Sequence, residues 1–164
     1  MIGRDEAVAT LAEGKEALDR LFAQLSDAEM ERPNTIGDAW SAKDLLGHVA
    51  FWEELALAAI AACRAGRRPE RVADGVDAAN ARNQERTREE PLAEVRARAA
   101  ASHAAVLDAI QSIDDAAWAA VAPGRRKRSL ADLVGGLLGA PGRPFGHPFA
   151  HLADLAAYVG SLRR

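Results

Sequence analysis

Apolar residues recur at intervals of three and four positions through most of this chain, and that spacing dictates helices. An α-helix returns to the same face about every 3.6 residues, so such a series places its members on one stripe that a neighbouring element can cover. No stretch alternates apolar and polar residues as a half-buried strand would. The sequence therefore predicts an all-α chain whose helices each bury one face.

Four long segments carry these stripes, and shorter segments join them. The four are residues 4–25, residues 42–65, residues 77–113 with a break at Pro91, and a last one that begins between residues 144 and 148 and ends at residue 162. A shorter helix is expected over about 130–138. Four main helices with short connections predict an antiparallel four-helix bundle.

Two serines mark where helices are expected to begin. Ser41 precedes Asp44 by three positions, which is close to a capping box, where the hydroxyl and the acidic side chain satisfy unpaired backbone N–H groups. Ser26 stands in the same relation to Glu29 and predicts a short extra turn that Pro33 ends.

Length and charge restrict the class of protein. With 164 residues, 49% of them hydrophobic and 27% charged, the chain is expected to form one domain over residues 1–164. Its formal net charge of −3 gives no electrostatic reason to expect nucleic acid or a membrane as a partner, and the basic run 125–128 is typical of a solvated loop. The single Cys63 rules out an intramolecular disulfide and is expected to pack between helices, with a catalytic thiol as the alternative. We find no signal-peptide pattern and no run approaching the ~20 apolar residues of a membrane span, so a cytoplasmic location is expected.

Three histidines lie on the apolar stripes. His147 and His151 are four positions apart, one turn on a helix, and His48 falls on the stripe of the second long segment. Burying an imidazole without partners costs about 1–3 kcal/mol, whereas one divalent metal ion would accept a lone pair from each ring. Three protein ligands with one open position are typical of catalytic zinc sites. The alternative is that each histidine bonds a neighbouring helix and holds no metal.

Pro148 separates the two C-terminal histidines and follows a Gly/Pro-rich segment. Proline is best tolerated in the first turn of a helix, where its missing N–H matters least. His147 is then expected at the helix N-cap, with its side chain aimed differently from that of His151. This feature favours the metal-free alternative.

Other polar residues on the helices are weaker candidates. His103 borders the third stripe and is expected to be a boundary histidine, with a fourth metal ligand or a proton shuttle as alternatives. Glu53 and Glu54 are adjacent and point different ways, so both are expected to be solvated, unless one of them supports a metal ligand.

The segment Trp40-Ser41-Ala42-Lys43-Asp44-Leu45-Leu46-Gly47-His48-Val49 resembles the second-helix signature of the DinB/YfiT-like superfamily. The pattern His147-x-x-x-His151, followed by apolar residues, is similar to that family's last helix, and the Asn80 region and the Ser102-His103 stripe are similar in character. The resemblance implies a four-helix bundle of the DinB/YfiT-like type in which His48, His147 and His151 hold a divalent metal, either Zn²⁺ or Ni²⁺. Relatives include transferases and isomerases that use mycothiol or bacillithiol. Another branch, similar to the colibactin self-protection proteins, keeps the bundle without the metal trio.

Together these observations lead us to expect a metal-dependent enzyme acting on a small molecule. An open metal position would lower the pKa of a bound water or low-molecular-weight thiol and so generate a nucleophile at neutral pH. Transfer of a thiol, with mycothiol or bacillithiol as partner, is the first expectation, and hydrolysis is the second. The alternative is a metal-free ligand-binding or protective bundle. A homodimer is also expected, because bundles of this size often pair.

Overall fold

The computed structural model describes residues 2–37 and 39–163, and within them the chain is helical with only isolated β-bridges. The helices are α1 (Arg4–Phe22), α2 (Asp27–Glu31), α3 (Ala42–Arg64), α4 (Gly75–Glu89), α5 (Leu92–Gln111), α6 (Asp115–Ala119), α7 (Leu130–Leu137), α8 (His147–Ala150) and α9 (Leu152–Ser161). The all-α prediction is confirmed.

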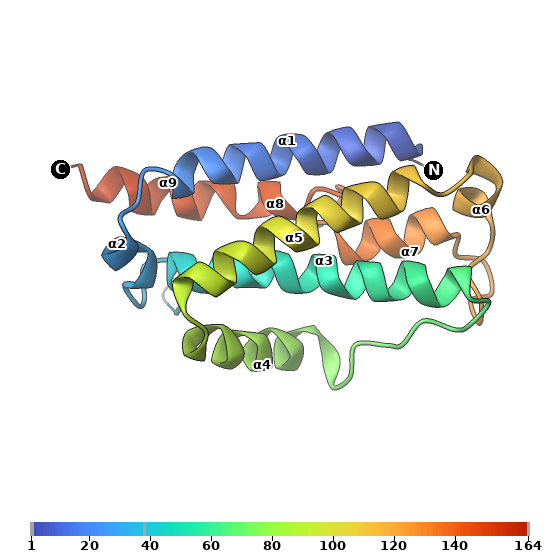
Figure 1. The fold of residues 1–164 in the computed structure, drawn as a ribbon, viewed down its shortest axis with the longest axis horizontal. Helices are drawn as coiled ribbons and strands as arrows, with labels where there is room; N and C mark the ends of the chain where they lie inside the picture. The colour runs from blue at the N-terminus through green and yellow to red at the C-terminus, as the bar shows by residue number, and fades with distance from the viewer. Residues whose placement is uncertain (1, 38, 164) are drawn as a thin grey trace.

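Helix α3 is the central element of a helical bundle. It packs against α5, α4 and α7, while α1 covers α5 on one side and α8 and α9 on the other. In Figure 1, α1 and α9 run from right to left, whereas α3 and α5 run from left to right. Residues from α1, α3, α5 and α9 share one core cluster, in which Leu18, Leu45, Val95 and Leu155 are fully buried.

The sequence of α3 explains its position. The predicted capping box at its start is present, because Asp44 N–H donates to Ser41 Oγ at 3.0 Å and Ser41 N–H donates to Asp44 Oδ2 at 2.9 Å. Contrary to the sequence expectation, α3 is long and apolar enough to cross a membrane by length and composition. However, 61% of its most apolar window is buried inside the fold, as befits a core helix.

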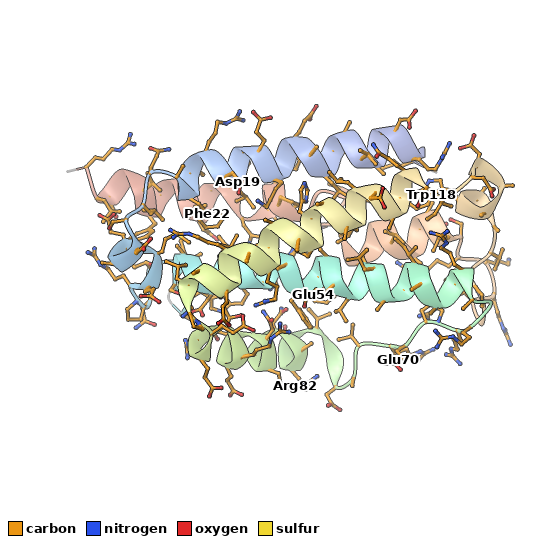
Figure 2. All side chains as sticks on the ribbon, viewed as in Figure 1. Asp19, Phe22, Glu54, Glu70, Arg82 and Trp118 are labelled. Atoms are coloured by element: carbon orange, nitrogen blue, oxygen red, sulfur yellow. The ribbon has the colours of Figure 1, made fainter. Side chains whose placement is uncertain are left out.

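The predicted break at Pro91 is present, and it separates two helices, α4 and α5, that run in opposite directions. Proline confines the residue before it to extended backbone, and Glu90 has φ −73° and ψ 138° ahead of Pro91. The chain turns back there, so that α4 lies along the outside of α3 (Figure 1). Only Ala79, Asn83 and Thr87 of α4 are buried, which accounts for its polar sequence. Arg82 lies on the outer side of this helix (Figure 2).

The last predicted helix is also divided. Helix α8 ends at Ala150 and α9 begins at Leu152, with His151 between them at φ −103° and ψ −6°. The His151 N–H bonds the Pro148 carbonyl three residues back, a tighter turn than that of an α-helix. The C-terminal histidines therefore lie on a short turn that leads into α9.

Candidate metal centre

The structure brings the three sequence-predicted histidines together. His48 comes from the second turn of α3, His147 opens α8, and His151 joins α8 to α9. The Nε2 atoms of His48 and His147 are 2.9 Å apart, and those of His147 and His151 are 3.1 Å apart. The ligand nitrogens of all three lie within 4.8 Å of one another, so one small ion could contact each of them.

Two of the three nitrogen separations, 2.9 Å and 3.1 Å, fit a common metal ion. Nitrogens bound to one zinc at about 2.0–2.1 Å, with bond angles between octahedral and tetrahedral, lie about 2.9–3.4 Å apart. Within hydrogen-bond distance the three rings join one another, and the Asn80 side chain is a further partner that acts on His48. The Nδ1 atom of His48 is buried without a partner. Because His48 on α3 and His147 on α8 bond each other, the hydrogen bonds alone suit both a metal site and the metal-free alternative.

Burial keeps these imidazoles neutral at physiological pH. It lowers the pKa of His48 to about 2, helped by the charges that His147 and His151 would carry. Burial likewise lowers the pKa of His147 to about 3, and His151 adds to the effect. The pKa of His151 is also lowered by burial, although Asp154 opposes the shift. Neutral rings offer the lone pairs that a metal ion needs.

Pro148 does not disturb the pair, and the expectation that His147 would be the N-cap is wrong. Gly146 is the N-cap, His147 is the first helical residue, and Pro148 is the second. The proline therefore stands where its missing N–H has no intrahelical partner to lose. The His147 N–H donates to the Leu138 carbonyl at 2.9 Å, which fixes the start of α8 against the end of α7.

Close helix packing holds the histidine-bearing elements in place. A Cβ atom on Gly14 would lie 2.9 Å from Phe149 Cε2 and 3.0 Å from Pro148 Cβ, so only glycine allows α1 to approach α8 this closely. A Cβ atom on Gly47 would lie 2.5 Å from Thr87 Oγ1, so α4 approaches α3 equally closely beside His48. Gly14 and Gly47 therefore determine how closely α1 and α4 pack against the helices that carry the histidines.

Aromatic rings surround His48. The Trp40 ring packs edge-on against it with centroids 4.6 Å apart, and the Trp52 ring lies at 6.4 Å. The Trp52 Nε1–H donates to Asn80 Oδ1 at 3.1 Å, which ties the indole to α4. The sequence pattern did not identify Asn80 as the partner of Trp52.

Glu53 is not solvated as expected, and it lies away from the three histidines. Its side chain is 2% exposed and faces α5. Oε2 accepts a hydrogen bond from Ser102 Oγ at 2.7 Å, and Oε1 lies 2.7 Å from His103 Nδ1. His103 is thus a partly buried boundary residue paired with Glu53, and it does not join the metal-ligand cluster. The sequence did indicate this burial. Glu53 is three positions before Ala56, which is buried, and residues three apart lie on the same face of a helix.

The other acidic candidate stays near the surface. Glu54 lies 3.6 Å from Arg86 and 3.5 Å from Arg98, and its side chain is one-third exposed. It contacts none of the three histidines.

A cavity of about 990 Å³ opens onto the histidine cluster. All three imidazoles line it, together with Trp40, Trp52 and other residues of α3 and α7. Small-molecule sites span about 300–1,000 Å³, so this cavity has room for an organic ligand as well as an ion.

Comparison with known proteins agrees with the geometry. The DinB superfamily matches residues 5–139, which include His48 and end before His147 and His151. No curated protein and no solved structure matches the chain. The match therefore supports the fold, and the structure brings His147 and His151, which lie beyond the matched residues, to His48.

Proposed function

The chain belongs to the DinB superfamily, and from this membership and the three converging imidazoles we propose that it is a metal-dependent enzyme acting on a small molecule. His48, His147 and His151 would hold the ion through Nε2. Three neutral nitrogen ligands suit both Zn²⁺ and Ni²⁺. The convergence of the three Nε2 atoms is the observation that carries the proposal.

A divalent ion held there would lower the pKa of a thiol or water at its open position and yield a nucleophile at neutral pH. The protein supplies the rest. The three rings fix the position of the ion, Trp40 and Trp52 restrict water beside it, and the cavity orients the second reactant.

The surroundings of the cluster favour thiol transfer over hydrolysis. Among the described residues that line the cavity, Glu70 is the sole carboxylate, and it belongs to the α3–α4 connection. Attack by water commonly uses a nearby general base, whereas a thiol coordinated to a metal loses its proton outright. We therefore propose transfer of a low-molecular-weight thiol, mycothiol or bacillithiol, to an electrophilic small molecule. Hydrolysis is the second candidate.

Thiol chemistry suits a reducing compartment, so a cytoplasmic location belongs to the same proposal. The competing function is a metal-free binding or protective bundle, which uses the same cavity without an ion. A homodimer stays a prediction.

Metal analysis tests the proposal. Protein purified without a nickel column is expected to hold about one equivalent of zinc or nickel, and His151→Ala is expected to hold less than a tenth of that. His103→Asn is the matched control, because its amide can still bond Glu53, and it should keep the metal. Equal metal content in the wild type and His151→Ala would show that the three histidines are not the metal site, and it would favour the metal-free function.

Activity then separates the two enzymatic candidates. Thiol transfer predicts consumption of a model electrophile such as monochlorobimane that depends on added mycothiol or bacillithiol and stops in His151→Ala. Turnover of ester substrates without added thiol would favour hydrolysis.

A further inference from the structure

The cavity that opens onto the three histidines also carries a group of arginines. We call this group the basic end; it consists of Arg67, Arg68, Arg71, Arg125 and Arg128. Glu70 is the one acidic residue among the described lining, so the local formal charge is four positive in a chain whose net charge is −3. A concentration of one sign in a cavity attracts ligands of the other sign.

The basic end lies far along α3 from the histidines. His48 is in the second turn of α3, whereas Arg67, Arg68 and Arg71 follow its last residue, Arg64. The lining residues of α3 run from His48 to Ala62, which spans about 21 Å at about 1.5 Å per residue. Figure 2 shows Glu70 on the connection beyond α3, at the end of the molecule that also carries Trp118.

Two separate loops build this end. A Cβ atom on Gly124 would lie 2.7 Å from Arg68 Cδ, so the loop after α6 packs directly on the connection after α3. Arg125 and Arg128 reach the cavity from that loop, and Arg126 between them does not line it.

The arginines here lack the carboxylate partners that others in the chain have. Arg20, Arg82, Arg96 and Arg98 each form an ion pair, but none of the five at the basic end does so among the described residues. Arg128 donates to the Asp132 backbone carbonyl, and the Nε of Arg125 is buried with no partner at all. A buried guanidinium nitrogen without an acceptor in the chain can take one from an anion or from an ordered water.

Between its two ends the cavity is apolar. Leu55, Ala59, Leu133 and Leu137 line its middle, and Val76 lines it although its side chain is 53% exposed. These side chains would contact the apolar part of a ligand.

We propose that the cavity also binds the second reactant of the proposed function, an elongated small molecule with a phosphate or carboxylate at one end, an apolar middle and a metal-ligating group at the other. The basic end binds the anion through forked guanidinium contacts, which match both oxyanions. The assignment of the metal-ligating group rests on the proposed function, whereas the assignment of the anion does not.

Binding of simple thiols tests the proposal on metal-loaded protein. Mercaptoundecanoic acid and mercaptoundecyl phosphate are the anionic probes, mercaptoundecanol is the neutral probe, and mercaptopropionate is too short to reach both ends. We expect the long anionic thiols to bind about tenfold or more tightly than the alcohol. The ratio between acid and phosphate identifies the preferred oxyanion. Equal affinity for the long acid and the alcohol would overturn the proposal.

Arg125→Gln is the decisive variant and Arg126→Gln its matched control, because each removes one charge from the same loop. Arg125→Gln should weaken the long anionic thiols about five- to tenfold and leave the alcohol unchanged, while Arg126→Gln should change neither by more than about twofold. If both variants lose the same affinity for the long anionic thiols, the effect comes from the net charge of the loop and not from a direct contact with Arg125, which would contradict the proposal. Arg71→Gln provides a second test from the other loop.

Metal-free protein separates this proposal from the proposed function. Dodecanoate and dodecanol carry no metal-ligating group, and we expect stripped protein to prefer dodecanoate in a manner that depends on Arg125. That result would support the basic end even if the wild type binds no metal. If stripped wild-type protein binds dodecanoate and dodecanol equally, while the loaded protein still holds its metal, the basic end is not an anion site and the proposed function is unaffected.

Discussion

The Nε2 atoms of His48 and His147 lie 2.9 Å apart although 99 positions separate the two residues in the chain. Each nitrogen is held by a different helix, and His151 brings a third to the same point. Two neutral imidazoles at this distance either form a hydrogen bond or bind one cation between them. Three nitrogen ligands suit a cation. The first prediction tests the cation, and the second concerns the protein without it.

Metal binding should stabilise the folded protein. A ligand that binds only the native state adds about 2.7 kcal/mol of unfolding free energy at a hundredfold excess over its dissociation constant. We expect Zn²⁺ or Ni²⁺ to raise the Tm of stripped protein, and EDTA to reverse the rise. Differential scanning fluorimetry measures both. His151→Ala should show no shift, while an unchanged wild-type Tm would favour the metal-free bundle.

The metal-free protein should lose stability in mild acid. His48 and His147 have folded-state pKa values of about 2 and 3, below the ordinary value, so below about pH 6.5 the unfolded chain binds protons that the folded chain does not. Stability is therefore full above that pH and falls as the pH drops towards the folded pKa values. Each ring contributes a slope of about 1.4 kcal/mol per pH unit.

Urea unfolding of stripped protein at pH 7, 6 and 5 measures this slope. The double variant His48→Asn, His147→Gln carries neither ring and should be much flatter over the same range. An equally steep loss in that variant would assign the acid sensitivity to other groups.

Gly14 should be more sensitive to substitution than another helical glycine. Gly14→Ala places a Cβ atom against Phe149 and Pro148 and pushes α8 away from α1. Overpacking costs about 1–3 kcal/mol, against about 1 kcal/mol gained from helix propensity. We expect a net loss of up to about 2 kcal/mol and several-fold weaker metal binding, measured by denaturation and calorimetry.

Gly160→Ala is the control for that substitution, because a Cβ atom there meets nothing within 4 Å. It should stabilise the protein by about 0.5–1 kcal/mol and leave metal affinity unchanged. Similar behaviour of the two alanine variants would show that α8 tolerates the added atom without moving.

Glu53 should matter for stability and not for the metal. Glu53→Ala leaves the Ser102 hydroxyl and the His103 ring without their shared partner in a buried site, at a cost of about 2–4 kcal/mol. Glu54→Ala removes only partly exposed ion pairs and should cost less than about 1 kcal/mol. Chemical denaturation gives both values, and metal content should be unchanged in each. Loss of metal in Glu53→Ala would connect this pair to the histidines.

Much of the fold follows from local pattern. The apolar stripes of α1, α3 and α5 predicted their helices, and Ser41 and Asp44 marked the start of α3, because both signals depend on residues a few positions apart. Pro91 predicted a break but not the reversal, since a proline fixes the backbone before it and leaves the later direction to packing. The same limit applies to His151, where a short turn interrupts the last helix.

The site was only partly accessible to the same reasoning. Helical stripes brought out the three histidines, but their meeting depends on how α8 packs against α7 and α1. Glu53 was predicted to be solvated because it carries a carboxylate, although its position beside the apolar stripe of α3 indicated burial. The basic end joins two loops about 55 residues apart, and neither loop's charge indicates which cavity it faces.

The wide separation of His48 from the C-terminal pair has a consequence for the life of the protein. One ion bound by all three rings would cross-link α8 and the start of α9 to α3 and so close a long loop of the chain. The turnover of the protein would then follow the supply of metal, because without the ion α8 and α9 would be held less firmly and would be open to proteases first.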